Sequence, residues 1–389
     1  MRVAIVHYWL VASRGGEMVV KALCEMFPDA VIFTHVSDPK IIAELFPGRE
    51  VRHSFIAGLP FARRHYQKYL PLMPLALEEL DLSEFDLVIS SESGPAKGVI
   101  PNPGARHICY CHTPMRYLWD QRHLYRQSLP WAQRSLFSLL SHPLRQWDVS
   151  TAARVDDFVA NSAFVAKRIK KYYRREADII HPPVDIHAFA DDAATPPPQR
   201  AVLDAVRDAY LWVGQLTQYK RPDLAVEAMS RLNRPLAVIG EGEEAARLKS
   251  IAGPTVKFLG RVDRASVIAA YQNCRALVFP GEEDFGIVPV EAMAAGKPVI
   301  AYAAGGALET IVDNETGVFF RDACIDSLID AVERLENELS GFNSVAIKSH
   351  AGNFSTDVFK NKFFATLKIG ENASASFSPL TETPLNSVA

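Results

Sequence analysis

The sequence predicts an α/β protein made of two Rossmann-like domains that face each other across a cleft. Short β-branched runs such as "RVAIV" and "DLVIS" alternate with longer amphipathic segments such as "GEMVVKALCEMF", which is the pattern of a parallel sheet wrapped by helices. The same alternation starts again after a Pro-rich stretch. A chain of 389 residues is also too long for one ordinary core.

The strands are expected where β-branched runs are bounded by turn residues. In the first half these runs are residues 2–6, 30–34, 86–90, 107–112 and 156–162, with helices at 16–27 and 162–173. In the second half they are residues 209–215, 235–240, 256–260, 276–280, 298–302 and 317–320. Ligands of such sheets bind at the carboxyl ends of the strands. Two facing sheets therefore predict one deep site between them.

The domain boundary is expected where prolines interrupt the alternation. The stretch "IIHPPVDIHAF" is followed by the polar, Pro-rich "DDAATPPPQR", a composition typical of a connection between domains. We therefore expect a first domain at 1–186 and a second at 187–345. Residues 371–389 contain mainly Ser, Thr and Pro with little to bury, so we expect a disordered tail there.

The charge balance argues against a nucleic-acid partner. Lys and Arg number 42 and Asp and Glu 45, a net charge of −3, which gives no global attraction to a polyanion. The scattered cysteines and the absence of a cleavable leader predict a cytoplasmic protein. No apolar run reaches the roughly 18 residues that span a bilayer. Residues 58–77 mix basic and aromatic side chains, which predicts either contact with an anionic membrane surface or an ordinary amphipathic helix.

Two glycines and two cations stand where helices are expected to begin. Gly15 and Gly16 follow the first strand, and a glycine pair at a helix amino end lets an anion approach; a tight turn without a ligand is the alternative. Lys220 and Arg221 stand at the entrance of another helix, where cations oppose the helix dipole. They indicate a bound phosphate, unless they form a solvated basic loop.

The stretch "FPGEEDFGIVPVEAMAAG" predicts a strand, an acidic loop and a helix with Pro289 near its start and Gly296 at its end. Glu283 lies in the loop and Glu291 in the first helical turn. Sugar hydroxyls are natural partners for such carboxylates, although the helix dipole alone would also favour Glu291. The backbone amides expected to face the ligand are those of Phe285, Gly286, Ile287 and Val288.

Two further residues of the first domain lie at strand ends. His112 closes the run "HICYCH", where a histidine can be either structural or part of a site. Ser162 precedes a helix, and its capping role is sufficient to explain it; a contact in the cleft would be additional.

These segments resemble the retaining glycosyltransferases of family 4, which have the two-domain GT-B fold. The resemblance lies in "VGQLTQYKRPDLAVEA", "FLGRVD" and "FPGEEDFGIVPVEAMAAGKPVIAY", with "RGGE" and "CHTPMRYLWD" in the first half. It covers about residues 1 to 365. The opening "VHYWLVASRGGEMVVKALCEMFPDA" most resembles bacterial mannosyltransferases that build O-antigen or exopolysaccharide units on a polyprenyl diphosphate. Close relatives return a C-terminal helix to the first domain, which implies that residues 346–370 do so here.

The resemblance implies a role for each matching residue. Glu283 and Glu291 match the family's paired glutamates, which hold the donor hexose and the ribose, respectively. Lys220 matches a lysine that neutralises the nucleotide diphosphate, and Gly16 a glycine beside it. His112 matches the histidine near the reacting sugar, and Ser162 a serine in the cleft of related mannosyltransferases.

One position departs from the family pattern. Gln215 stands where an arginine is usual, and glutamine can donate hydrogen bonds but carries no charge. Either Arg221 compensates or the leaving group is less stabilised.

The implied reaction is transfer of mannose from GDP-mannose to a lipid-linked saccharide, without a metal or other cofactor and at the inner face of the cytoplasmic membrane. A transferase using a UDP-sugar, a nucleotide-sugar epimerase of the same fold and a sugar-binding subunit without catalysis are the alternatives.

Overall fold

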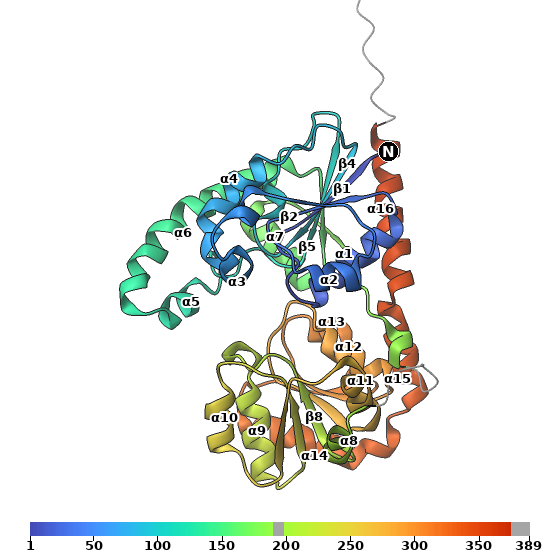
Figure 1. Ribbon diagram of the computed structural model, residues 1–389. Coiled ribbons are helices and arrows are strands. Elements are labelled where there is room, and N and C mark those ends of the chain that lie inside the picture. Colours follow the sequence, from blue (N-terminus) through green and yellow to red (C-terminus); the bar gives the residue numbers. More distant parts are fainter. Residues whose placement is uncertain (190–197, 375–389) are drawn as a thin grey trace, which may run out of the picture.

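The computed structural model describes residues 1–189 and 198–374, which form two lobes stacked on each other (Figure 1). The expected linker at 191–200 falls mostly outside the described residues, and the expected tail at 371–389 lies outside them from residue 375 on. None of the described helices is long and apolar enough to cross a bilayer.

The first lobe is built on a seven-stranded sheet with strand order β3-β2-β1-β4-β5-β6-β7. Its strands are β1 (Val3–His7), β2 (Val31–Thr34), β3 (Val51–His53), β4 (Leu87–Glu92), β5 (Arg106–Cys111), β6 (Asp157–Ala160) and β7 (Asp178–Ile179). Its helices are α1 (Gly15–Met26), α2 (Pro39–Leu45), α3 (Ala62–His65), α4 (Met73–Glu78), α5 (Arg122–Ser128), α6 (Trp131–Thr151) and α7 (Ala163–Tyr173).

The second lobe is built on a six-stranded sheet with strand order β10-β9-β8-β11-β12-β13. Its strands are β8 (Tyr210–Val213), β9 (Leu236–Ile239), β10 (Val256–Gly260), β11 (Ala276–Phe279), β12 (Val299–Tyr302) and β13 (Gly317–Phe320). Its helices are α8 (Arg200–Val206), α9 (Pro222–Arg231), α10 (Ala245–Ile251), α11 (Arg264–Asn273), α12 (Ile287–Ala294), α13 (Ala307–Thr310), α14 (Ile325–Glu338) and α15 (Ser344–Ala351).

Both faces of each sheet are covered by helices. In β1, Ile5 packs in one apolar cluster with residues of α1, whereas Val6 packs in another with Leu77 of α4. Successive side chains of a strand point to opposite faces, so each face of the sheet has its own core. All pairings within the two sheets are parallel. The predicted α/β class with two parallel sheets is therefore confirmed.

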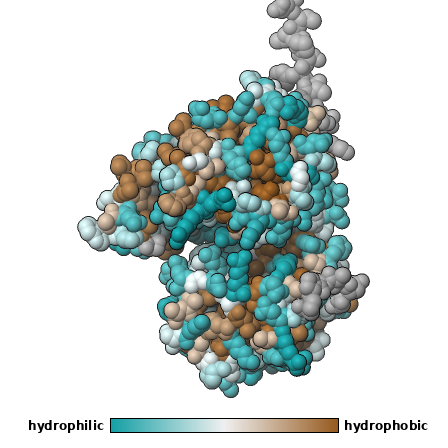
Figure 2. Space-filling view, in the orientation of Figure 1, coloured by the Kyte–Doolittle hydropathy of each residue, from teal (hydrophilic) through white to brown (hydrophobic). Residues whose placement is uncertain are grey.

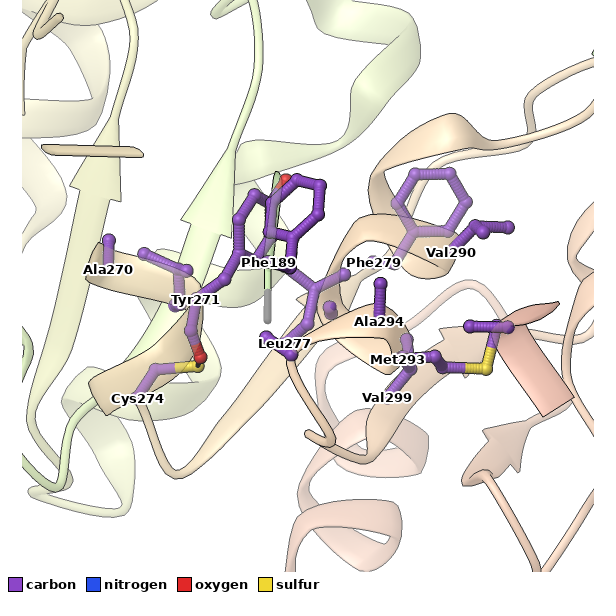
Figure 3. Packing of buried hydrophobic residues seen from close by; sticks show 14 of the residues in the cluster. Phe189, Ala270, Tyr271, Cys274, Leu277, Phe279, Val290, Met293, Ala294 and Val299 are labelled. Atoms are coloured by element: carbon purple, nitrogen blue, oxygen red, sulfur yellow. Dashed lines mark hydrogen bonds between the residues drawn. The ribbon is translucent and has the colours of Figure 1, made fainter. Parts of the chain in front are cut away.

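Figure 3 shows the core beneath the carboxyl end of β11. Leu277 and Phe279 of β11 pack against Val290 and Met293 of α12. Burying side chains of this size contributes about 1.5 to 3 kcal/mol each. The contacts fix α12, and with it the loop before it, rigidly on the sheet.

Two strands were not predicted. β3 has three residues, "VRH", and β7 has two, and both lie at an edge of the first sheet. Edge strands are short and partly exposed, so their sequences lack the apolar run that marks the central strands.

The segment 58–77 is not one amphipathic helix. It is divided into the end of a 3-10 turn (Phe55–Gly58), α3, a second 3-10 turn (Tyr66–Leu72) and α4. Pro60, Pro71 and Pro74 explain the divisions, because proline lacks a backbone donor and clashes with the preceding turn.

Residues 346–370, expected as one helix, form parts of two. α15 packs against α12 in the second lobe, and the 3-10 turn Gly352–Phe354 then leads into α16 (Thr356–Ser374). Phe359 and Phe363 of α16 pack in the cluster that contains α1. The chain therefore crosses back to the first lobe at this turn, as Figure 1 shows for the red helix.

Candidate active site

The carboxyl ends of the two sheets face each other, and Figure 2 shows a cleft that opens between the lobes. Gly15, at the amino end of α1, lies directly against Ile287, at the amino end of α12, so closely that a Cβ at Gly15 would overlap the isoleucine side chain. A side chain at Gly15 would have to displace the end of the Ile287 side chain. Two helix amino ends, one from each lobe, thus meet at the cleft.

Lys220 and Glu283 form an ion pair at the carboxyl edge of the second sheet. Nζ of Lys220 lies 2.6 Å from Oε1 of Glu283, with only 16% and 21% of the side chains exposed. Burial alone would lower the pKa of Lys220, but the Glu283 carboxylate outweighs it and the pKa of Lys220 is raised. The lysine therefore carries its charge at neutral pH, beside a carboxylate whose other oxygen can still accept hydrogen bonds.

The loop that carries Glu283 is held by close backbone packing. Gly281 approaches the backbone of Lys220, where a Cβ would lie 2.8 Å from the Lys220 Cα. On the other side, the amide of Gly306 donates to the carbonyl of Glu283 at 2.9 Å. Any side chain at either glycine would push the loop away, so the position of the Lys220–Glu283 pair depends on them.

The helix α12 begins where its sequence predicted. Gly286 adopts a left-handed φ of 87° just before the helix, and Gly296 one of 73° just after it. Phe285 buries its ring against His181 and Phe354. The first amides of a helix have no intrahelical acceptor, so those near Ile287 are positioned to bind an anion at the cleft.

Glu291 is placed differently from the expectation. It lies beyond the first turn of α12 and accepts hydrogen bonds from Nη1 of Arg264 at 2.8 Å and from Tyr271 at 2.9 Å. Because it already pairs with a cation and a phenol, the helix dipole is not needed to explain it. Tyr271 is fully buried, so the core fixes the direction of this carboxylate.

Arg221 and Gln215, both expected to bind the donor, lie in the segment between β8 and α9. The Arg221 guanidinium binds Asp223 on its own helix, with Nη2 at 3.0 Å from Oδ2. Arg221 also has a left-handed φ of 51° at the start of α9. Gln215 is exposed in the loop after β8. Of the two alternatives for Gln215, compensation by Arg221 would require the guanidinium to release Asp223.

His112, which is half-buried, is linked to the fully buried Ser91 and His7 in a chain of three polar side chains. Its Nε2 lies 2.8 Å from Oγ of Ser91, which in turn lies 3.0 Å from Nδ1 of His7. Burial lowers the pKa of His112 to about 4, and burial together with His112 lowers that of His7 to about 3. Both rings are neutral at pH 7. A Cβ at Gly16 would lie 3.7 Å from Nε2 of His112, so the histidine borders the glycine pair.

Asp284 was not singled out from the sequence, yet it joins the two lobes. Its carboxylate accepts hydrogen bonds from Arg116 and Arg168, both of the first lobe. Its backbone carbonyl accepts one from Oγ of Ser162 at 2.6 Å. Ser162 also caps α7, as predicted, by accepting from the amide of Val165 at 3.1 Å. Arg116 lies in the same loop after β5 as His112. Its position after a strand end could have identified Arg116 as a cleft residue from the sequence.

A second contact between the lobes was also missed. Glu309 of α13 accepts hydrogen bonds from the amides of Ala163 at 2.8 Å and Phe164 at 3.1 Å, at the amino end of α7. His181 lies 3.3 Å from the same carboxylate. Although burial acts in the opposite direction, these hydrogen bonds lower the pKa of Glu309. Acidic residues of one lobe thus bind both a helix end and arginines of the other.

The structure brings together most of the predicted residues. The edge of the second sheet carries Lys220, Glu283 and the start of α12. The facing edge of the first sheet carries Gly15, Gly16, His112 and Ser162. Among residues 1–189 and 198–374, no group of three or more His, Cys, Asp or Glu could hold a metal ion.

Two family models match successive parts of the chain. The Glycosyltransferase Family 4 model matches residues 13–188, and the Glycosyl transferases group 1 model matches residues 200–341. The boundary between them agrees with the boundary between the two sheets.

Curated relatives are distant. The D-inositol 3-phosphate glycosyltransferase of Mycobacteroides abscessus is 31% identical over 191 residues, or 46% of this chain and 43% of that protein. That of Mycobacterium leprae is 28% identical over 52% of each chain. This chain therefore spans about half the length of these relatives. The alpha-1,3/1,6-mannosyltransferase alg2 of Schizosaccharomyces pombe is 25% identical over 95% of this chain and 81% of that protein.

Solved structures agree in fold along nearly the whole chain. Sucrose-phosphate synthase of Thermosynechococcus elongatus superposes with a TM-score of 0.72 at 18% identity, covering 96% of this chain and 100% of that one. Anabaena Alr3699/HepE in complex with UDP-glucose gives 0.70 at 17% identity, covering 95% and 100%. The two facing sheets are thus the GT-B fold, and the chain is similar to the Glycosyltransferase Family 4 model in its first half and to the Glycosyl transferases group 1 model in its second.

Proposed function

We propose that the protein is a retaining hexosyltransferase that moves mannose from GDP-mannose to a hydroxyl of a lipid-linked saccharide in bacterial polysaccharide synthesis. The observation that carries this proposal is the Lys220–Glu283 pair, which lies at the carboxyl edge of one sheet while Ile287, at the amino end of α12, touches Gly15 of the other lobe. In this proposal the second lobe binds the donor and the first binds the acceptor.

The donor sugar would be held by Glu283. Its Oε1 is engaged by Lys220 at 2.6 Å, while the other oxygen can accept from hexose hydroxyls. Because the lysine partly neutralises the carboxylate, Glu283 is suited to orienting the sugar rather than to attacking it. Glu291 would bind the ribose, with its orientation fixed by Tyr271 and Arg264.

The leaving diphosphate would be stabilised by positive groups of this chain. Negative charge develops on the departing oxygen during transfer, and groups already aimed at it lower the barrier most. Lys220 and the first amides of α12 come from the second lobe, and the amino end of α1 at Gly16 comes from the first. These groups supply the charge that a metal ion supplies in other transferases, so we propose that transfer requires no divalent cation.

The acceptor would approach from the first lobe. His112 is neutral and is held by Ser91, so it can exchange a hydrogen bond with a sugar hydroxyl without carrying a charge. For retention, the acceptor hydroxyl attacks from the face that the diphosphate leaves. Its proton passes to an oxygen of the departing β-phosphate, and the glycosidic bond forms as the bond from the anomeric carbon to phosphate breaks.

The choice of mannose rests on the sequence resemblance and on the relative from Schizosaccharomyces pombe, a mannosyltransferase that is 25% identical over 95% of this chain. The resemblance to enzymes acting on polyprenyl diphosphate saccharides suggests the acceptor. A UDP-sugar donor remains the alternative within the same fold, because no residue that would contact the base has been assigned.

Mass spectrometry of the products tests the reaction class. The purified protein is incubated with GDP-mannose, with and without a polyprenyl diphosphate saccharide. The proposal predicts a glycolipid heavier by one hexose and one GDP per transfer, with only slow release of GDP when the acceptor is omitted. An isomeric nucleotide sugar formed without acceptor would show an epimerase instead. Binding without any product would show a sugar-binding protein.

A further inference from the structure

We propose that the hairpin α5–α6, together with the neighbouring segment that carries α3 and α4, is a docking surface for an anionic lipid bilayer. We call this surface the acid-free face and define it as residues 55–77 and 121–147. It lies on the outer side of the first lobe, where Figure 1 shows α5 and α6 projecting beyond the sheet.

The acid-free face has an unusual charge composition. Its two segments contain 23 and 27 residues without a single Asp or Glu, although the chain has 45 acids in 389 residues, or about six for every fifty. The same fifty residues contain seven Lys and Arg. Because acids are absent, the net charge of these fifty residues is +7 in a chain whose net charge is −3, as expected for a surface that meets anions.

The two segments form one surface. Leu70, from the first segment, packs against a buried cluster made by Met115, Leu118 and Leu144, the last of which belongs to α6. Figure 1 likewise shows α3 and α4 beside α6. The basic side chains of both segments can therefore act on the same ligand.

Large apolar side chains are exposed on this surface. Three on α6 are Trp131, Leu136 and Leu139, with exposed fractions of 84%, 56% and 71%. Leu136 and Leu139 are three residues apart and so lie on one side of the helix. Figure 2 shows hydrophobic residues gathered over this part of the upper lobe. The other segment adds Phe61 and Leu75, exposed to 75% and 53%.

The base of the hairpin is anchored in the first lobe. Asp148, at the end of α6, is fully buried and binds the ammonium group of the equally buried Lys97. It also accepts from Nε1 of Trp119 at 2.7 Å and from Tyr173. Within the hairpin, Nε of Arg126 donates to Ser138 at 3.1 Å and joins α5 to α6. Separating α6 from the lobe would leave the buried charges of Asp148 and Lys97 unpaired, which is costly. The network therefore holds α6 in a fixed position on the first lobe.

An anionic bilayer fits these features better than other partners. Headgroups supply negative charge and the acyl region beneath accepts apolar side chains, so basic and apolar groups are satisfied together. A second copy of this chain would bring seven cations against seven more, which like-charge repulsion disfavours. A nucleic acid would leave Leu136 and Leu139 without an apolar partner.

The acid-free face also continues directly into the cleft. The loop after β5, which carries His112 and Arg116, leads within a few residues into α5. Asp120 in this connection binds Arg168, which in turn binds Asp284 of the other lobe. Docking would place the acceptor side of the cleft at the bilayer. This consequence rests on the proposed function, whereas docking itself requires neither donor nor acceptor.

Vesicle co-sedimentation tests the proposal. The full chain is mixed with vesicles of phosphatidylglycerol and phosphatidylethanolamine, or with vesicles of phosphatidylcholine alone, in the absence of sugar and nucleotide. We expect binding to the anionic vesicles, weaker binding to phosphatidylcholine and release at high salt, because screening weakens surface electrostatics. Equal binding to both vesicle types, or no binding to either, would overturn the proposal.

Two pairs of variants locate the contact. Leu136→Ser/Leu139→Ser should weaken binding to anionic vesicles about tenfold or more, whereas Ile100→Ser/Val345→Ser, at exposed positions outside the face, should not. Binding should also weaken about tenfold or more in the triple variant Arg63→Gln/Arg64→Gln/Lys68→Gln. The matched control, at exposed positions outside the face, is Lys40→Gln/Lys249→Gln/Lys257→Gln, and its binding should change less than about twofold. Circular dichroism confirms folding. Unchanged binding of both face variants would contradict the proposal.

Two further measurements separate the bilayer from other occupants. Lipids brominated in the acyl chain should quench tryptophan fluorescence in the wild type and less in Trp131→Ser. If sedimentation velocity showed self-association that Leu136→Ser/Leu139→Ser abolished, without vesicle binding by the wild type, the face would be a contact between two copies of the chain. If the wild-type protein bound anionic vesicles but showed no transferase activity, the proposed function would be refuted and this inference would stand.

Discussion

Nζ of Lys220 lies 2.6 Å from Oε1 of Glu283 and so joins the loop after β8 to the loop after β11. These loops are far apart in the sequence, and each follows a strand at the carboxyl edge of the second sheet. One ion pair therefore positions both the cation proposed to face the leaving diphosphate and the carboxylate proposed to hold the sugar.

Lys220→Met should reduce the turnover number about 100- to 1000-fold, because it removes a positive group aimed at charge that develops in the transition state. The turnover number is measured at saturating donor in the transfer assay with a lipid-linked acceptor. Lys249→Met, at an exposed position of α10, is the matched control and should leave the rate within about twofold. A rate for Lys220→Met that also stays within twofold would remove Lys220 from the site.

Asp284→Asn should loosen the contact between the lobes. It leaves Arg116 without its carboxylate and Arg168 with Asp120 alone, and the two arginine side chains are only 14% and 11% exposed. We expect a loss of about 2 kcal/mol or more in the free energy of unfolding and a larger radius of gyration by small-angle X-ray scattering. Asp326→Asn breaks an exposed pair with Arg231 and should cost less than about 1 kcal/mol. Equal effects of the two changes would contradict the joining role of Asp284.

Protonation of buried histidines should make the protein less stable in acid. Burial lowers the pKa of His7 to about 3, and of His35, His107 and His112 to about 4. Because the pKa of each histidine is lower in the folded than in the unfolded protein, the histidines do not reduce the free energy of unfolding above the unfolded-state pKa of about 6.5. The free energy of unfolding decreases as the pH falls toward 4, by up to about 1.4 kcal/mol per pH unit for each histidine.

Nuclear magnetic resonance and urea unfolding check this prediction together. The ring protons of the four histidines should not shift between pH 8 and pH 5, while those of free histidine in the same sample should. The free energy of unfolding should fall between pH 6.5 and pH 5. Titration of His112 near pH 6.5 would show that its ring is not held neutral by burial.

Removal of divalent cations should not change the rate of transfer. Lys220 and the amino ends of α1 and α12 provide the positive charge in the proposed mechanism. The rate in excess EDTA should therefore stay within about twofold of that with Mg²⁺. A large loss in EDTA that added Mg²⁺ restores would show that the diphosphate is stabilised by a metal ion.

Much of the fold could be predicted from the sequence because its central strands are buried on both faces. Strands such as β9 and β11 therefore read as unbroken apolar or β-branched runs with turn residues on either side. The position of α12 was likewise predictable from Pro289 and Gly296. The edge strands β3 and β7 and the broken segment at 58–77 were not, because their shapes depend on neighbouring elements and on closely spaced prolines.

Candidate site residues could be singled out from the sequence where they lie in a loop that follows a strand and carry a charge or an imidazole. Lys220, Glu283 and His112 do so. Asp284 and Glu309 act through partners more than 100 positions away, such as Arg168 and Ala163, and sequence spacing carries no signal for such pairs. The pairing of Arg221 with Asp223, only two residues along the chain, was not predicted either.

The central claim is tested most directly by the melting temperature in the presence of nucleotide sugars. A ligand that binds only the folded protein raises its melting temperature by mass action. We predict that GDP-mannose raises it by several degrees at a concentration about 100 times the dissociation constant, which adds about 2.7 kcal/mol, and that Glu283→Ala reduces the shift. A shift with UDP-glucose and none with GDP-mannose would contradict the assignment of the donor.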